Sequence, residues 1–369
     1  MRVLHVIARM NFGGTARYLV ELNNGLTAHG VENFIAAGHV EGKETLDPSA
    51  EGISIISIAS LARSINPMQD FKAATELEKI IKEIKPDIVH THTFKAGLIT
   101  RLQIKKLKKI ASKNIKFVHT FHGHLFDDPE FSGPKAMVIA GIEKRLAKKT
   151  DVLVSVGLKV SADLVSRGIG TRQKFVNIPP GVRALPVADR TMSRAKFGIA
   201  ADTPVIGWIA RVTGVKNPMR AVEIARALPQ AQFLLAGGGD LLDTVRAHAP
   251  ENMQVLGWTE PSELFAASDL IISTSENEGM PIALIEAQLA GLPVVATDAG
   301  SVSEVVLNGH TGFVTTKESA PIIQACTDLI ARPDIRADMG ARARIHAQEY
   351  FSIDGMVDSH LSMYNKVMK

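Results

Sequence analysis

The sequence has a single cysteine, few aromatic residues and no long apolar run. Cys326 is the only cysteine in 369 residues, which excludes an internal disulfide and any metal site built from several cysteines. No uncharged apolar run approaches the roughly 18 residues needed to span a bilayer. The first residues lack the apolar core of a signal peptide. These absences predict a cytoplasmic protein whose membrane contact, if any, is peripheral.

Charge is distributed unevenly along the chain. The net charge is +4, but residues 1–180 carry 26 basic against 17 acidic residues, and residues 181–369 carry 16 against 21. The densest basic stretch, Arg101–Lys116, has seven basic residues and no acid. It is interpreted either as a solvated helix face or as a helix lying on an anionic membrane, with an apolar side formed by Ile104, Leu107 and Ile110. Aromatic residues do not interleave with these charges, which argues against nucleic acid as a partner.

Short β-branched runs alternate with helical segments throughout the chain, which is typical of parallel sheets covered by helices. The first series predicts helices near 15–29, 70–84, 95–111 and 134–149, and strands near 3–8, 33–38, 53–58, 87–91, 116–121 and 151–156. A second series predicts strands near 204–210, 232–236, 253–256, 270–275, 293–297 and 312–315. The turn-rich passage 180–195 separates them. We therefore expect two α/β domains, 1–183 and 184–349.

The stretch from Ser273 to Ala287 predicts a strand, a polar loop and a helix. Pro281 suits the first helical position and Gly291 the residue after the helix end. Glu286 falls on the apolar side of this helix, where a carboxylate needs a partner. The free N–H groups at the helix start suit an anion such as a diphosphate, while Glu278 and Glu286 suit neutral hydroxyls beside it. The alternative is two ordinary surface glutamates paired with lysine or arginine.

Other glycine and polar residues also follow predicted strands. In open parallel sheets, ligands gather beyond the carboxyl ends of the strands. Arg211 and Lys216 would supply two cations from one loop, able to stabilise a leaving diphosphate, although ordinary surface charge is the alternative. The residues placed at these ends are Asn11, Gly13, Gly14, His90, His92, His119, His122, His124, Arg211, Lys216, Gly237, Gly238, Gly239, Asp240, Glu278, Asp298, Gly300 and Ser301.

The histidines of the first domain raise the question of a metal site. His119 and His122 lie on opposite sides of the chain, and no acid accompanies the group as a ligand. We therefore expect no catalytic metal and no cofactor. His122 is the candidate for a role near a sugar hydroxyl, because neutral imidazole both accepts and donates hydrogen bonds. His92 and His124 are assigned to structural or peripheral roles.

Several of these motifs together resemble the retaining glycosyltransferases of family 4. They are Glu278-x7-Glu286 with Gly279-Met280-Pro281 between, Gly207-Trp208-Ile209-Ala210-Arg211 with Lys216, Ala236-Gly237-Gly238-Gly239, and Asn11-Phe12-Gly13-Gly14-Thr15-Ala16. The resemblance covers the whole chain. It implies the GT-B fold, in which two Rossmann-like domains face across a cleft, and a last helix, 350–369, that returns to the first domain.

The resemblance also implies roles for individual residues. His122, Arg211, Lys216 and Glu278 would be catalytic: Arg211 and Lys216 neutralise the diphosphate, Glu278 contacts hydroxyls of the donor sugar, and His122 lies near donor and acceptor. Glu286 would hold the ribose. The remaining donor-binding residues would be Gly13, Gly14, Gly237, Gly238, Gly239, Gly279, Met280, Pro281 and Ile282.

The predicted function is therefore metal-independent transfer of a sugar, with retention, from a nucleotide sugar such as a UDP-sugar. The acceptor would be a glycan hydroxyl, possibly polyprenyl- or lipid-linked, in bacterial surface-polysaccharide synthesis. Two alternatives stay open: a nucleotide-sugar epimerase of the same fold, and a non-catalytic nucleotide-sugar sensor. Only a transferase requires an acceptor to release the nucleoside diphosphate.

Overall fold

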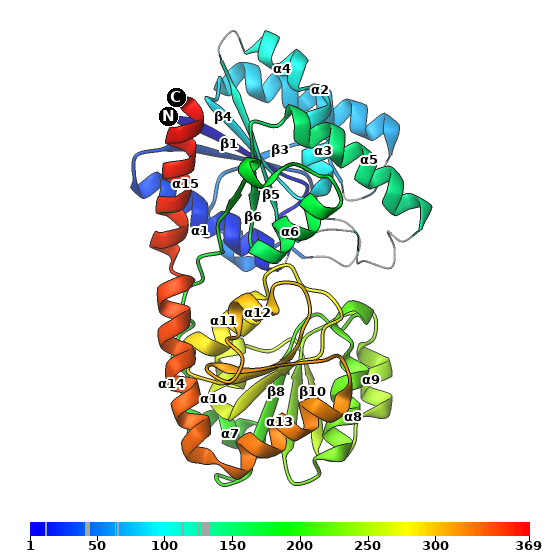
Figure 1. Cartoon of the computed structure of the whole chain (residues 1–369), viewed down its shortest axis with the longest axis vertical. Helices are drawn as coiled ribbons and strands as arrows, with labels where there is room; N and C mark the ends of the chain where they lie inside the picture. The colour runs from blue at the N-terminus through cyan, green and yellow to red at the C-terminus, as the bar shows by residue number, and fades with distance from the viewer. Residues whose placement is uncertain are drawn as a thin grey trace. The chain divides into compact units, whose positions relative to one another are not determined.

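The computed structural model describes residues 1–11, 13–40, 45–62, 64, 66–111, 114–123, 126 and 133–369. Two compact units divide the chain: Met1–Gly181 together with Ile353–Lys369, and Val182–Ser352. Each unit is built on one parallel sheet with helices on its faces (Figure 1). The prediction of two doubly wound parallel-sheet α/β domains is confirmed.

The sheet of the first unit has seven strands in the order β3-β2-β1-β4-β5-β6-β7. They are β1 (Arg2–Ile7), β2 (Glu32–Ala37), β3 (Ile55–Ser57), β4 (Ile88–His92), β5 (Lys116–Phe121), β6 (Val152–Ser155) and β7 (Phe175–Asn177). The strand order reverses direction between β1 and β4. Ligands of such sheets bind beyond the carboxyl ends of the two strands at this reversal.

The helices of the first unit are α1 (Gly14–Ala28), α2 (Pro67–Ile84), α3 (Phe94–Leu102), α4 (Ile104–Ile110), α5 (Pro134–Lys149), α6 (Leu158–Ser166) and α15 (Ile353–Met368). The prediction of one helix over 95–111 is wrong, because the backbone of Gln103 (φ −106°, ψ 14°) interrupts it. Strand β7 and helix α6 were not predicted. Helices α1 and α15 lie side by side (Figure 1).

The two faces of this sheet differ in character. On one face, residues such as Leu4, Val89 and Phe117 pack against apolar side chains of α2, α3 and α4. The opposite face carries His5, which is paired in register with His90. Helices α1 and α15 supply hydroxyl and imidazole groups to the histidines of that face. One face of this sheet thus packs an apolar core, and the other combines an apolar cluster that includes Ile7 and Leu19 with a buried polar network.

Within the described residues 101–111 and 114–116, the basic stretch Arg101–Lys116 does not form a free amphipathic surface helix. Arg101 is fully buried and pairs with Glu143 of α5. Of the predicted membrane-facing side, Ile104 and Leu107 are buried in the core and Ile110 is half-buried. The expectation that this apolar side lies against a membrane is therefore wrong, because it packs on the core of the first unit. Among the described residues, no helix is long and apolar enough to cross a bilayer.

The sheet of the second unit has six strands in the order β10-β9-β8-β11-β12-β13, so its reversal lies between β8 and β11. The strands are β8 (Val205–Ile209), β9 (Gln232–Ala236), β10 (Met253–Gly257), β11 (Leu270–Ser273), β12 (Val294–Thr297) and β13 (Gly312–Thr315). The helices are α7 (Arg190–Lys196), α8 (Pro218–Ala227), α9 (Leu242–His248), α10 (Pro261–Ala267), α11 (Ile282–Leu289), α12 (Val302–Val305), α13 (Ser319–Ala331) and α14 (Pro333–Tyr350).

Candidate functional site

The predicted site residues fall into two sets, one on each unit. In the first unit, Gly13 and Gly14 follow β1, and His122 follows β5. In the second unit, the two cations follow β8, the glycine turn follows β9, and Glu278 with the start of α11 follows β11. In each sheet, some of the predicted site residues therefore follow the strands between which the strand order reverses, β1 and β4 in the first sheet and β8 and β11 in the second.

Lys216 and Glu278 form an ion pair in the second unit. The Nζ of Lys216 lies 2.5 Å from Oε1 of Glu278, and the Ser275 hydroxyl donates to the same oxygen at 2.7 Å. Both side chains of the pair are largely buried. A cation and a carboxylate that sit together in this way present both charge and hydrogen-bonding capacity to one ligand. Ser275 was not predicted as a site residue, although it lies in the loop that carries Glu278.

The backbone around Glu278 is held by a close approach that only glycine permits. Gly300 has φ +54°, and a Cβ there would lie 1.7 Å from the carbonyl oxygen of Glu278. The loop after β12 therefore packs directly on the loop that carries the carboxylate. A side chain at Gly300 would displace one of the two loops.

The start of α11 presents free backbone donors. Within the described residues, the N–H groups of Gly279, Met280 and Ile282 have no acceptor, so they are available to an anion. The helix begins at Ile282, one residue later than predicted. Pro281 (φ −77°, ψ 93°) is therefore the N-cap residue and not the first helical residue. Gly291, with φ +81°, follows the helix end as predicted.

Glu286 lies on α11 and is 6% exposed. Its burial agrees with its position on the apolar side of the helix.

Arg211 stands on a loop that packs on the glycine turn. A Cβ at Gly237 would lie 1.8 Å from the Ala210 carbonyl oxygen, and one at Gly239 would lie 2.3 Å from that of Val212. The amide of Val212 donates to the Gly238 carbonyl at 2.9 Å. The glycines thus let the turn contact the backbone on both sides of Arg211, whose own side chain is exposed.

Glu276, two residues before Glu278, belongs to a separate network. Its Oε1 accepts hydrogen bonds from Asn217 at 2.8 Å and Arg220 at 2.6 Å. Burial alone would raise the pKa of Glu276, but these hydrogen bonds and the charges of Arg220 and Lys317 outweigh it and lower the pKa. Glu276 is therefore a paired carboxylate that ties this loop to α8.

In the first unit, a buried carboxylate fixes the glycine turn after β1. Gly13 has φ +147°, and its N–H donates to Oδ2 of Asp47 at 2.9 Å. Nε of Arg17 lies 3.7 Å from the same oxygen. Asp47 was not predicted, because a single acid before Pro48 has no distinguishing pattern in the sequence.

His122 lines a cavity of about 250 Å³ in the first unit. The aromatic rings of Phe94, Phe121 and Phe126 contribute to its wall, together with Glu143. Burial, followed by repulsion from His360, lowers the pKa of His122 from 6.5 to about 3. The imidazole is therefore neutral near pH 7 and able both to donate and to accept a hydrogen bond.

The wall of this cavity contains a buried ion pair with spare hydrogen-bonding capacity. Nη2 of Arg101 donates to Oε1 of Glu143 at 2.7 Å. Within the described residues, Oε2 of Glu143 and Nη1 of Arg101 have no partner. Sequence reasoning missed Glu143, although it follows Ile139 by four residues on the apolar side of α5, the same signal that singled out Glu286. His124 lies outside the described residues.

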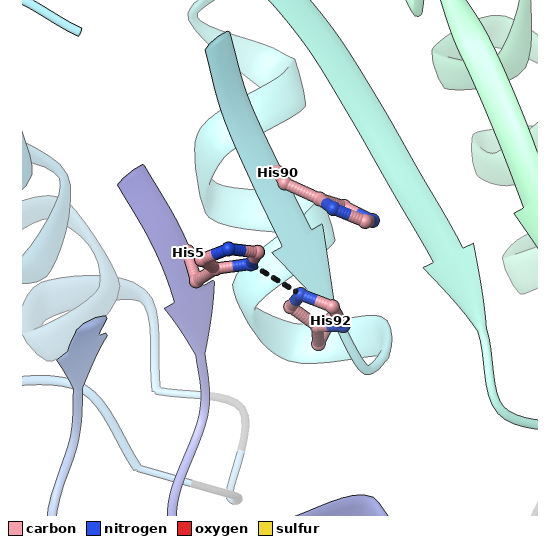
Figure 2. A group of neighbouring side chains, drawn as sticks. All are labelled: His5, His90 and His92. Carbon is pink, nitrogen blue, oxygen red and sulfur yellow. Dashed lines mark hydrogen bonds between the residues drawn. The ribbon is translucent and has the colours of Figure 1, made fainter. Parts of the chain in front are cut away.

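Three histidines on the polar face of the first sheet come close together. Figure 2 shows His5 on β1 beside His90 and His92 on β4. A nitrogen of each lies within 4.8 Å of the others, which is the spacing of a possible metal site. The group was not predicted, since His5 stands alone in the sequence.

Hydrogen bonds already use most of these nitrogens. Nδ1 of His5 lies 3.1 Å from Nε2 of His92. The nitrogens of His90 lie 2.5 Å from the Tyr364 hydroxyl and 2.6 Å from that of Thr120. A metal ion would break these bonds, and the group offers no carboxylate or thiolate ligand. The donor set therefore fits a hydrogen-bonded network better than a metal ion.

Comparison with known proteins places the chain in a family. The model described as Glycosyltransferase Family 4 matches residues 12–184, and the model described as Glycosyl transferases group 1 matches residues 189–346. The chain belongs to glycosyltransferase family 4. This glycosyltransferase shares its fold with HepE from Anabaena, solved with UDP-glucose, at a TM-score of 0.81 and 20% identity, over 99% of this chain and 100% of that one.

Two curated relatives are similar in sequence to this glycosyltransferase. The UDP-Gal:alpha-D-GlcNAc-diphosphoundecaprenol alpha-1,3-galactosyltransferase of Escherichia coli is 27% identical, over 72% of this chain and 71% of the relative. The N-acetyl-alpha-D-glucosaminyl L-malate synthase of Bacillus anthracis is 25% identical, over 82% and 81%. The prediction of a family 4 glycosyltransferase with the GT-B fold is confirmed.

Proposed function

We propose that this glycosyltransferase moves a sugar, with retention, from a UDP-sugar to a hydroxyl of a lipid-linked glycan in bacterial surface-polysaccharide synthesis. The observation that carries the proposal is the second unit's combination of the Lys216–Glu278 pair with free N–H groups at the start of α11. Cations and backbone donors suit a diphosphate, and a carboxylate suits sugar hydroxyls. The name of the E. coli relative supplies the donor and acceptor class.

The charges favour departure of the diphosphate without a metal. Lys216, Arg211 and the α11 N–H groups would stabilise negative charge as it develops on the leaving oxygens, the largest effect such a site can offer. Glu278 would accept hydrogen bonds from the donor sugar, and Glu286 from the ribose. The acceptor hydroxyl would then attack from the face that the diphosphate leaves, with its proton passing to a leaving-group oxygen.

The cavity beside His122 is the proposed place for part of the acceptor. Its volume of about 250 Å³ is below that of pockets for whole drug-sized ligands, so it would hold one group of a larger molecule. Aromatic rings suit the apolar face of a sugar, and Glu143 has a free acceptor oxygen for a hydroxyl or amide N–H.

Product analysis tests the function. We expect the enzyme to release UDP from a UDP-hexose only when a polyprenyl-diphosphate-linked sugar is present, and the product to have the anomeric configuration of the donor. A new nucleotide sugar formed without acceptor would instead identify an epimerase. Tight UDP-sugar binding without turnover, across UDP-glucose, UDP-galactose and their N-acetylated forms, would identify a sensor.

Helix α5 is a better candidate than α4 for contact with an anionic membrane. Met137 and Val138 are 71% and 61% exposed. Lysine and arginine residues occupy five further positions of this helix, and its single acid, Glu143, is buried. Exposed apolar groups beside basic ones match the interface of an anionic leaflet, where each basic residue contributes about 1 kcal/mol.

We expect the enzyme to co-sediment with vesicles containing phosphatidylglycerol, and salt to weaken the binding. Lys144→Gln with Lys148→Gln should reduce binding several-fold. The matched control, Lys105→Gln with Lys109→Gln, removes two exposed charges from α4 and should have a smaller effect. Equal effects of the two pairs, or equal binding to neutral vesicles, would contradict a specific role of α5.

A further inference from the structure

We infer that Asn33, acting through His5 and His92, holds His122 in the tautomer whose Nε2 carries the proton and whose Nδ1 is free to accept. The inference concerns how the His122 of the proposed function is prepared, and its meaning for catalysis rests on that function. Asn33 and His5 are then positioning residues at a distance from the reacting groups.

Three imidazoles form a hydrogen-bonded row. Nδ1 of His5 lies 3.1 Å from Nε2 of His92, and Nδ1 of His92 lies 3.1 Å from Nε2 of His122. Burial lowers the pKa of all three rings, so each is neutral near pH 7 and carries one proton. A neutral imidazole has one donor and one acceptor nitrogen. The protons of the row must therefore all point toward His122 or all away from it.

The orientation of the Asn33 amide is determined by its own partners. Nδ2 of Asn33 donates to the Val31 carbonyl at 3.2 Å and to Oγ1 of Thr27 at 3.3 Å. Oγ1 of Thr27 can only accept here, because its proton goes to the Asn23 carbonyl at 2.8 Å. These two acceptors identify the amide atom that faces them as the nitrogen, Nδ2. The amide oxygen, Oδ1, therefore lies on the other side of the Asn33 amide group.

Asn33 and His5 have complementary atoms without partners. Asn33 is in register with Val3, so it lies on the same face of the sheet as His5, two residues further along. Oδ1 of Asn33 and Nε2 of His5 are both buried and unpaired within the described part of the chain. Burial and then the charge of His360 lower the pKa of His5, whereas the Asn33 side chain raises it, as a hydrogen-bond acceptor does.

An amide oxygen at this end of the row selects the direction of every proton. With this acceptor oxygen on its side of the ring, Nε2 is the favoured position for the His5 proton, so Nδ1 of His5 accepts from Nε2 of His92. Nδ1 of His92 then accepts from Nε2 of His122. The opposite direction would set the lone pair of His5 Nε2 against that of the amide oxygen, with neither satisfied. We expect the selected tautomer to predominate about tenfold or more.

The consequence is a His122 whose Nδ1 lone pair is available to a substrate hydroxyl. In the other tautomer this nitrogen would carry a proton, so it could donate to a hydroxyl oxygen but could not accept the hydroxyl's proton. The row therefore prepares His122 without any charged group, in agreement with the absence of a carboxylate among its hydrogen-bond partners in the described residues.

The test is the ¹⁵N spectrum of the histidine side chains in the full-length enzyme at pH 7. We expect His122 to show a protonated Nε2 and an unprotonated Nδ1. Asn33→Leu should remove the preference, and Asn33→Asp, which keeps an acceptor oxygen, should retain it. Thr27→Val is the matched control: it removes one Asn33 contact but keeps Oδ1, so the His122 tautomer should not change.

Kinetics separate this inference from the proposed function. Asn33→Leu should lower kcat about tenfold, leave UDP affinity unchanged, and have no further effect when His122 is already replaced by alanine. A protonated Nδ1 in the wild-type enzyme, or an unchanged tautomer in folded Asn33→Leu, would overturn the inference. The expected tautomer in a protein that transfers no sugar would uphold the inference and reject the proposed function instead.

Discussion

Mild acid is expected to unfold the first unit while the second stays folded. Burial lowers the pKa of six histidines in that unit: His5 and His122 to about 3, His360 to about 4, and His90, His92 and His119 well below 6.5. The unfolded chain takes up these protons near pH 6.5 and the folded unit does not. Stability is therefore complete above pH 6.5 and falls as the pH decreases toward the folded-state values.

The expected loss is large compared with the stability of a domain. At pH 4.5, two units below 6.5, His5, His122 and His360 alone would lower the free energy of unfolding by about 8 kcal/mol. Whole domains have about 5–15 kcal/mol. The first unit should therefore unfold cooperatively between about pH 5 and 4, with uptake of several protons.

The two units can be followed separately. Both tryptophans, Trp208 and Trp258, belong to the second unit, so their fluorescence should persist after hydrogen exchange shows that the first sheet has opened. His119→Gln should reduce the proton uptake by about one. Simultaneous loss of both units, or a first unit that stays folded at pH 4, would show that these histidines do not control acid stability.

Replacing Lys216 or Arg211 by alanine is expected to lower kcat roughly 10²-fold or more in each case. Both cations lie on the loop after β8, and Lys216 is already paired with Glu278 at 2.5 Å. They would stabilise charge that develops only as the diphosphate leaves, so kcat should fall more than donor affinity. Since these cations would take the place of a metal, activity should persist in a chelator such as EDTA.

The ion pair makes a second, sharper expectation possible. Lys216→Ala and Glu278→Gln should be strongly non-additive, because each removes the other's partner. Lys317→Ala is the matched control, since Lys317 is a nearby cation that contacts Glu276 instead, and its effect should stay within a few-fold. Normal kcat with only a raised KM in the Lys216 and Arg211 variants would show that they hold the donor without assisting departure.

Much of the fold could be predicted because its signals are local. Alternation of β-branched runs with helical segments indicated every strand of the two sheets except β7, and Gly291 indicated the end of α11. Local signals were weaker where the chain changes direction without a strong breaker. Gln103 interrupts the predicted helix over 95–111, and the short strand β7 was missed.

Part of the candidate site could also be predicted from local sequence signals. Motifs at strand ends singled out Lys216 and Glu278, and the structure brings them together, although their roles remain predictions. Ser275 and Gly300 were not assigned roles, because their importance lies in contacts with Glu278 that are made across a folded loop.

The sequence by itself determined the two α/β sheets, the family motifs and the polar residues at strand ends, because hydrophobic period and turn chemistry are written in neighbouring residues. Only the tertiary structure decided which charges and rings meet. Arg101 pairs with Glu143, 42 residues away, instead of facing a membrane. His5 joins His92 and His122 because β1 and β4 are adjacent in the sheet although 80 residues separate Ile7 from Ile88. Such contacts depend on strand order and helix packing, which bring together residues that no local pattern relates.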